Sequence, residues 1–257
     1  MSGQTLGDLL RYWRRTRGTS QLDLASAAAT TPRYVSFVET GRAHPTRHMV
    51  VRLARALDVP LRERNGLLLA AGYAPSYPHA ELEAPELAQV STALTAMLTR
   101  HEPFPAVVLD RGWNVLRANE GATRLFGGLL APAPLPDPAN VLRLMIEPGP
   151  VRNAVLNWTQ VAPALLDRAR REAVGGVLDL ATAELVRELR ALPEVAATGE
   201  PSTTSTPVLD VRFRWQDTEF AFFSVVSTIG TPIDITAQEL RVEAFFPADE
   251  TTRTEWR

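Results

Sequence analysis

The sequence predicts an α+β protein of two domains, with five short helices over residues 1–72 and a five-stranded antiparallel sheet with helices over residues 86–257. Two observations lead to this fold class. Apolar residues recur every three to four positions in the first 72 residues, whereas several stretches after residue 105 alternate with a period of two. Between them, residues 73–85 (YAPSYPHAELEAP) contain three prolines, which is typical of a semi-rigid linker.

The composition is that of a globular protein and excludes several kinds of site. Of the 257 residues, 45% are hydrophobic and 22% charged, and there is no cysteine, so disulfides, thiolate zinc sites and a cysteine nucleophile are excluded. No apolar run reaches the roughly 20 residues that span a bilayer, and the N-terminus does not resemble a secretory signal. We therefore expect a cytoplasmic protein.

The charge is unevenly distributed between the two domains. Residues 1–72 hold 11 arginines and five acidic side chains, a net charge of +6, whereas the remainder carries −8. A basic first domain beside an acidic second one indicates that only the first meets a polyanion, although chance variation in surface composition is an alternative.

The first two helices are predicted over residues 5–17 and 21–28. The apolar spacing of Leu6, Leu9, Leu10 and Trp13 gives the first helix one buried face, and Gly18 ends it. Ser20 is a suitable N-cap for the second helix, with Asp23 at the position of a capping-box acid.

Three further helices complete the first domain. Thr31 caps the third, which has Pro32 at its first position and ends at Gly41 in a left-handed cap. The turn 44–46 leads into a fourth helix with an apolar stripe through residues 49–57, and Pro60 opens a fifth that ends near Gly72.

This pattern resembles the Cro/cI-type helix-turn-helix of the xenobiotic-response-element family. The residues that carry the resemblance are Gln21, Ala25, Val35, Val38, Glu39, Gly41 and the stretch 53–57. The resemblance implies double-stranded DNA as partner, with the third helix in the major groove. Ala29 departs from the family, which has glycine there in a left-handed conformation; alanine costs on the order of 1 kcal/mol in that conformation.

The register of the motif assigns candidate DNA contacts. Arg33 suits guanine O6 and N7, and Phe37 a thymine methyl group, although Arg33 as a solvated surface residue and Phe37 as core are alternatives. The side chains that would face the groove are Pro32, Arg33, Ser36 and Phe37. Those expected at phosphates are Gln21, Thr31, Arg42 and His44.

The second domain begins with a helix, two strands and a helix. The helix is predicted over residues 86–100, the strands over 106–110 and 113–119 around the turn 111–112, and a short helix begins at 122. This order is the entry motif of PAS-like sensor domains.

The remainder predicts an irregular stretch, helices and three more strands. Residues 129–140 hold four prolines; helices are expected over 141–146, 151–173 and 178–192, and a polar loop over 198–207. The strands are expected over 208–215, 219–230 and 239–249, which makes a five-stranded sheet with helices against one face.

Taken together, the chain resembles actinobacterial regulators with an MmyB-like ligand-binding domain. The stretches that carry this resemblance are 61–65, 70–75, 101–103, 113–115, 222–224, 230–232 and 243–247, together with Asp110, Asn119, Asn153, Asn157 and Trp158. The resemblance implies a PAS-like second domain that binds a small, largely apolar ligand, for which a fatty acid is the precedent.

Candidate ligand-binding residues come from the predicted sheet and the helices above it. The apolar candidates are Phe213, Phe222, Val226 and Phe246 on the sheet, and Leu144 and Trp158 on helices. Arg143, Asn119, Asn153 and Asn157 are candidates for a carboxylate head group. As alternatives, Arg143 and Asn157 face solvent and Asn119 caps the following helix.

The sequence offers no basis for an enzyme, a cofactor or a metal site. His44 and His48 are four residues apart, but Pro45 lies between them and no acid completes a metal set; His101 is a weak haem candidate. From the two resemblances we predict a homodimeric transcription regulator that binds a pseudo-palindromic operator and a small apolar ligand, for which the family precedent is a fatty acid. The alternatives are a second domain that only dimerises or docks a protein partner, and a catalytic second domain.

Overall fold

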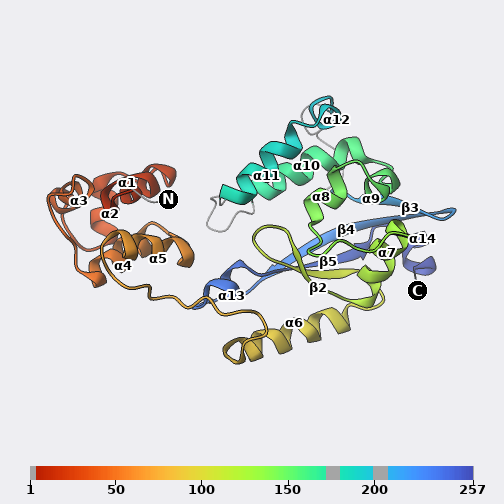
Figure 1. The fold of residues 1–257 in the computed structure, drawn as a ribbon, viewed down its shortest axis with the longest axis horizontal. Helices are drawn as coiled ribbons and strands as arrows, with labels where there is room; N and C mark the ends of the chain where they lie inside the picture. The colour runs from red at the N-terminus through yellow and green to blue at the C-terminus, as the bar shows by residue number, and fades with distance from the viewer. Residues whose placement is uncertain (1–3, 172–179, 199–207, 257) are drawn as a thin grey trace. The chain divides into compact units, whose positions relative to one another are not determined.

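A computed structural model describes residues 4–171, 180–198 and 208–256 (Figure 1). The chain divides into two compact units. The first comprises Met1–Ala80 and Pro232–Gln238, and the second comprises Glu81–Thr231 and Glu239–Arg257. The first division lies within the stretch expected to be a linker, whereas no sequence pattern assigns residues 232–238 to the N-terminal unit.

The N-terminal part of the first unit consists of the five predicted helices. They are α1 (Leu6–Thr16), α2 (Gln21–Ala27), α3 (Pro32–Glu39), α4 (Arg47–Ala56) and α5 (Leu61–Ala70). Capping boxes begin α1 and α2. The Thr5 and Ser20 side chains accept from the backbone N–H groups of Asp8 and Asp23, whose carboxylates accept from the backbone N–H groups of Thr5 and Ser20 in return. Thr31 caps α3 through the N–H of Tyr34.

The helix-turn-helix is closely packed on α1. A side chain on Gly7 would meet the backbone oxygen of Glu39 at 2.5 Å, so only glycine allows α1 to lie this near the end of α3. The core beneath is apolar and fully buried, as the motif predicts; it includes Leu10, Trp13, Leu24, Val35, Val38, Val50 and Leu53.

The turn between α2 and α3 has the backbone conformation that the motif predicts. Ala29 has φ +44°, in the left-handed region where an L-residue with a Cβ is strained. Its neighbours Ala28 and Thr30 donate their N–H groups to carbonyls of α2, so hydrogen bonding holds the strained turn in place. Gly18, Gly41 and Gly72 also have positive φ and directly follow the C-cap residues of α1, α3 and α5, which confirms that left-handed glycines end these helices.

The second unit is built on a five-stranded sheet of order β2–β1–β5–β4–β3, with every pair antiparallel (Figure 1). The strands are β1 (Ala106–Leu109), β2 (Val115–Ala118), β3 (Val211–Trp215), β4 (Thr218–Thr228) and β5 (Arg241–Pro247). The longest pairing runs from Phe222 opposite Pro247 to Thr228 opposite Arg241, in the centre of the sheet.

Helices cover both faces of this sheet, whereas the sequence predicted helices against one face (Figure 1). On one side, α6 (Ala88–Arg100) follows a short 3₁₀ turn, Pro85–Leu87, and packs Leu94 and Leu98 against Val108 and Val242. The opposite side carries α7 (Glu120–Leu130), α8 (Val141–Ile146), α9 (Pro150–Ala154), α10 (Trp158–Arg171), α11 (Leu180–Arg190) and α12 (Pro193–Ala196). This side holds the larger core of the unit.

The single helix predicted over 151–173 is wrong, because two helices occupy that stretch. The chain leaves helical geometry at Val155, which forms a β-bridge to Phe213. The Asn157 side chain then makes two hydrogen bonds to the start of β3: it donates to the carbonyl of Asp210 and accepts from the N–H of Arg212. Bonds to a strand more than 50 residues away interrupt the helix, and local spacing cannot reveal them.

Three short helices, α12, α13 (Ile235–Glu239) and α14 (Glu250–Glu255), were not predicted. Asp249 caps α14, whose Thr252 is buried and accepts from the N–H of Ala221. The loop predicted over 198–207 falls largely outside the described residues.

The left-handed turn at Ala29 gives a direct test of the strain. We expect Ala29→Gly to raise the free energy of unfolding of the first unit by about 0.5–1 kcal/mol, because glycine removes the Cβ clash but adds unfolded-state entropy. Hydrogen exchange of α2 and α3 amides in the full chain measures this. Ala27→Gly is the control, since Ala27 is exposed and right-handed helical, and the same substitution there should destabilise. Equal effects at the two positions would contradict the argument.

Candidate DNA-binding surface and ligand cavity

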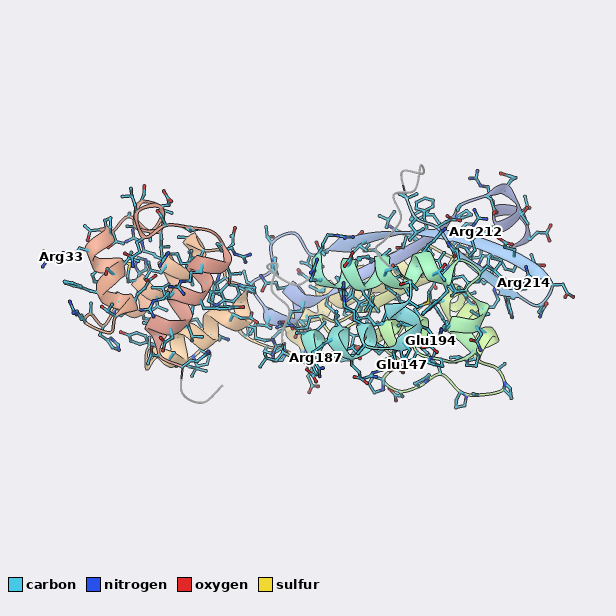
Figure 2. All side chains as sticks on the ribbon, turned by 90° about the horizontal axis from the view of Figure 1, so that it is seen from above. Arg33, Glu147, Arg187, Glu194, Arg212 and Arg214 are labelled. Carbon is cyan, nitrogen blue, oxygen red and sulfur yellow. The ribbon has the colours of Figure 1, made fainter. Side chains whose placement is uncertain are left out.

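The candidate DNA-binding residues lie on the N-terminal part of α3 and on the segments that flank it. Thr31, Pro32 and Arg33 are exposed, as are Arg42 and His44 in the loop after α3. Ser36, Phe37 and Gln21 are half-buried. Figure 2 shows the Arg33 side chain extending outward from the helices of the first unit, where a polyanion could reach it.

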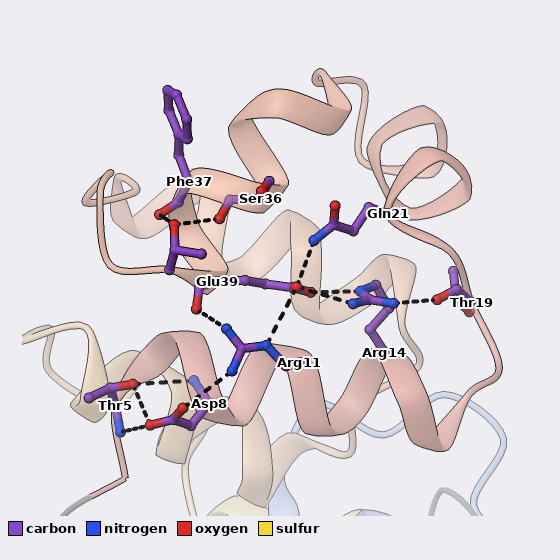
Figure 3. A network of polar contacts seen from close by, with 10 residues as sticks. Thr5, Asp8, Arg11, Arg14, Thr19, Gln21, Ser36, Phe37 and Glu39 are labelled. Carbon is purple, nitrogen blue, oxygen red and sulfur yellow. Dashed lines mark hydrogen bonds and ion pairs between the residues drawn. The ribbon is translucent and has the colours of Figure 1, made fainter.

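Arg33 and Phe37 form a pair one helical turn apart. The guanidinium carbon of Arg33 lies 5.2 Å from the centroid of the Phe37 ring, within cation–π range. Figure 3 shows that ring pointing away from the buried polar cluster of the motif. The pair therefore presents a planar donor group stacked on an apolar ring, which suits a guanine edge beside a methyl group.

The helices beneath this surface are tied together by one buried carboxylate, Glu39, at the end of α3 (Figure 3). Arg14 of α1 donates to both of its oxygens, at 2.6 and 3.1 Å, and the Gln21 amide of α2 donates at 2.8 Å. Arg11 donates to the Glu39 backbone carbonyl at 2.6 Å. The carboxylate is thus fully paired although only 2% of its side chain is exposed.

This pairing sets the protonation of Glu39. Burial alone raises the pKa of a carboxyl group, but the hydrogen bonds from Arg14 and Gln21 and the charges of Arg14 and Arg11 outweigh burial, so the Glu39 pKa is lowered. The pKa of Arg14 is raised by its hydrogen bond to Glu39, against the effect of burial. The Gln21 amide, expected at a phosphate, donates to Glu39 in the structure.

A cavity of about 380 Å³ lies in the second unit between α10 and the inner face of the sheet. Such a volume is within the range of small-molecule sites. From the helices and the segment before β3, the walls are Phe126, Val141, Met145, Val161, Ala164, Leu165, Arg168, Arg171, Val208 and Leu209. From the strands they are Val211, Phe213, Phe223, Ser224, Val226, Glu243 and Phe245.

The polar groups of the cavity come from α10 and the two central strands. Arg168 donates to Glu243 at 2.7 Å and to the Ser224 hydroxyl at 3.3 Å, and its guanidinium lies over the Trp113 ring. The charges of Arg168 and Glu243 therefore offset each other within the protein. Arg171, one turn along α10, is exposed and adds a further cation at the wall.

Only some of the predicted ligand residues line this cavity. Phe213 and Val226 do, whereas Phe222 belongs to the buried core beside Trp256. Leu144 lines a separate void of about 30 Å³. The placement of Phe246 on the cavity face is wrong: its neighbour Phe245 lines the cavity, whereas the Phe246 ring stacks on Phe223 and meets the His101 ring edge-on.

The polar candidates and Trp158 bind the protein itself. Asn119 caps α7 and bonds to the backbone at residues 104 and 106, which agrees with the capping alternative. Arg143 is exposed and pairs with Glu147 and Glu188. Asn157 holds β3, Asn153 is exposed, and the Trp158 indole donates to the carbonyl of Met145. None of these five side chains lines the 380 Å³ cavity.

Sequence reasoning missed the part of the cavity wall that α10 supplies, although it predicted a helix in this stretch. Val161, Ala164, Leu165 and Arg168 follow a spacing of three to four residues, so one face of the predicted helix did carry the signal. The choice between Phe245 and Phe246 had no such signal, because two adjacent aromatic residues in a strand point to opposite faces.

Within the described ranges, no group of three or more histidine, aspartate or glutamate side chains could hold a metal ion. No helix among the same residues is long and apolar enough to cross a membrane.

Two family models match the chain. The model described as helix-turn-helix matches residues 10–64, and the model described as MmyB-like transcription regulator ligand binding domain matches residues 90–257. Both resemblances drawn from the sequence, and the predicted fold class, are thereby confirmed. No curated protein matches the chain.

The Glu39 pairing predicts a large loss of stability for Arg14→Gln. The variant leaves a buried carboxylate short of its main partner, so we expect the first unit to lose about 3 kcal/mol of unfolding free energy, measured by hydrogen exchange. Arg15→Gln is the matched control, because Arg15 is exposed on the same helix and should change stability by about 0.5 kcal/mol or less.

The lowered pKa of Glu39 also predicts how this difference depends on pH. A group whose folded pKa is depressed adds stability above its unfolded pKa of about 4.3, and that stability is lost as pH falls through the lower folded pKa. The difference between wild type and Arg14→Gln should therefore be largest near neutrality and shrink in acid. A difference that grows in acid would refute the assignment.

Proposed function

The chain belongs to the family of the MmyB-like transcription regulator ligand binding domain, and we propose that it is a sequence-specific, ligand-responsive regulator of transcription. Its helix-turn-helix unit is the DNA-binding part, and its second unit is the ligand-binding domain. The effector that we propose is a small, largely apolar molecule such as a fatty acid. The observation that carries the proposal is the cavity beneath α10, in a chain whose other unit has an exposed, basic helix-turn-helix.

The DNA half of the proposal rests on charge and on the accessibility of α3. The first 72 residues carry +6, and the exposed Arg33 and Arg42 lie on and just after α3. Lysine-free, arginine-rich surfaces suit bidentate contacts to guanine and phosphate. Several phosphate contacts would make the affinity for DNA fall steeply with salt. A homodimer would set two α3 helices one DNA turn apart on a pseudo-palindromic operator.

The ligand half rests on the walls of the cavity. Most of its lining is aliphatic or aromatic, which favours a hydrocarbon portion of the ligand over a polar one. Arg168 is already bonded to Glu243, so the cation available for an acidic head group is Arg171 at the exposed end of α10. An amphipathic acid would then lie with its chain along the sheet and its carboxylate at Arg171.

Arg33 provides the test of DNA recognition. We expect Arg33→Ala to relax base preference at one position of each half-site, with a loss of discrimination of about 1–3 kcal/mol, measured by sequencing DNA selected from a random pool. Arg55→Ala removes the same charge from an exposed position on α4 and should leave the selected sequence unchanged. Should Arg33→Ala weaken binding to every sequence equally, Arg33 contacts phosphate and not bases.

The cavity provides the test of ligand binding. Ala164→Phe should fill the space beneath α10 and weaken binding of dodecanoate, used as the probe, by about tenfold or more, equivalent to about 1.4 kcal/mol. Ala93→Phe, on the exposed side of α6, is the control and should bind the probe as the wild type does. Native mass spectrometry of the purified full chain measures retained and added ligand. Equal binding by both variants would place the ligand elsewhere and favour a second domain that only dimerises or docks a partner.

A further inference from the structure

The segment between β4 and β5 does not belong to the unit that contains those strands. Pro232–Gln238 is part of the first unit, although both flanking strands are part of the second. Three of its side chains are buried, since Asp234, Ile235 and Ala237 are 6%, 3% and 5% exposed, whereas Ile233 is 81% exposed. The family resemblance and the sequence pattern both leave this segment without a role.

Backbone and side-chain hydrogen bonds attach one end of the segment to residues 78–80. The N–H of Ile235 donates to the Pro78 carbonyl at 2.9 Å. The N–H of Ala80 donates to Asp234 Oδ2 at 3.1 Å, and the Thr236 hydroxyl donates to the Ala80 carbonyl. These bonds form a short, partly buried junction that a freely moving surface loop would not make.

The other end of the segment caps α5. Pro60 is the N-cap residue of that helix and makes no side-chain cap, which leaves the first N–H groups without an intrahelical partner. The N–H of Leu61 instead donates to Gln238 Oε1 at 2.7 Å. Helix α5 is thus completed by a residue 177 positions further along the chain.

The strands that lead into this segment form a wall of the ligand cavity. Ser224 and Val226 of β4 and Glu243 and Phe245 of β5 line it, and Val226 lies opposite Glu243 in the ladder. The β5 end is held within the second unit by the buried ion pair of Glu239 and Arg111, at 2.8 Å. Five residues separate Val226 from the segment on the β4 side, and four separate Glu243 from it on the β5 side. Connections this short transmit a shift of the strands to the segment.

We propose that Pro232–Gln238 is the element through which the state of the cavity reaches the DNA-binding unit. The inference rests on the proposed function, since it requires both ligand and DNA binding. A ligand that displaces β4 and β5 pulls on the Asp234 junction and on the Gln238 cap of α5. Because α5 packs against α1 and α4, the change alters the stability of the helix-turn-helix. The ligand then binds one state of the junction better than the other, as coupling requires.

The test is a set of four full-length proteins whose affinity for a selected operator is measured. They are the wild type, Ala164→Phe as a fixed occupant of the cavity, Asp234→Ala as a broken junction, and the two substitutions combined. We expect Ala164→Phe to change DNA affinity about fivefold or more in the wild-type background and less than twofold when Asp234 is replaced. An equal change in both backgrounds, or no change in either, would overturn the proposal.

Two further variants separate the junction from general destabilisation. Asp217→Ala makes the same substitution in the exposed turn at the opposite end of β4, and should leave the effect of Ala164→Phe intact. Gln238→Ala removes only the α5 cap, so it keeps the proposal testable if Asp234→Ala fails to fold, and it should reduce the effect of Ala164→Phe. If neither the wild type nor any variant binds the operator, the proposed function is contradicted instead. The junction itself is tested only by the change in DNA affinity that Ala164→Phe causes.

Discussion

The pairing of β4 with β5 is the constraint on which the second unit depends. The ladder places Ser224 opposite Phe245 and Val226 opposite Glu243, so one face of these two strands becomes a wall of the cavity. Val242 on the other face packs under α6. A shift of the register by one residue would exchange the two faces, removing both the cavity wall and the α6 contact. The same pairing also determines where the connecting residues 232–238 leave the sheet.

Each unit buries a carboxylate and pairs it with an arginine. In the first, Glu39 is fully paired with donors from α1 and α2, which keeps three helices in one arrangement under the exposed Arg33. In the second, Glu243 is paired with Arg168 at the cavity wall. Each pair leaves a different, exposed arginine available for an anionic partner. The paired charges therefore hold the surrounding elements in place, and the exposed arginines are the ones that the proposed function assigns to anionic partners.

Most polar residues that stand within apolar runs serve the backbone. Asn119, Asn157 and Gln238 each complete hydrogen bonds of elements distant in sequence. Burying backbone N–H and carbonyl groups requires such partners, and a short amide side chain supplies a donor and an acceptor together. An isolated asparagine beside apolar residues is thus an ambiguous signal, because capping and ligand binding demand the same chemistry.

Family matches to residues 10–64 and 90–257 leave residues 232–238 within the ligand-binding domain, where their packing with the first unit is not evident.

The sequence by itself determined the helices of the first unit, their caps and the strands of the sheet. These features depend on local periodicity and on the conformational limits of single residues, which can be recognised from residues close together in the sequence. Only the tertiary structure decided the break between α9 and α10, the face on which Phe245 rather than Phe246 lies, and the capping of α5 by Gln238. Each of these follows from hydrogen bonds or packing between residues far apart in the chain, whose energy no local pattern records.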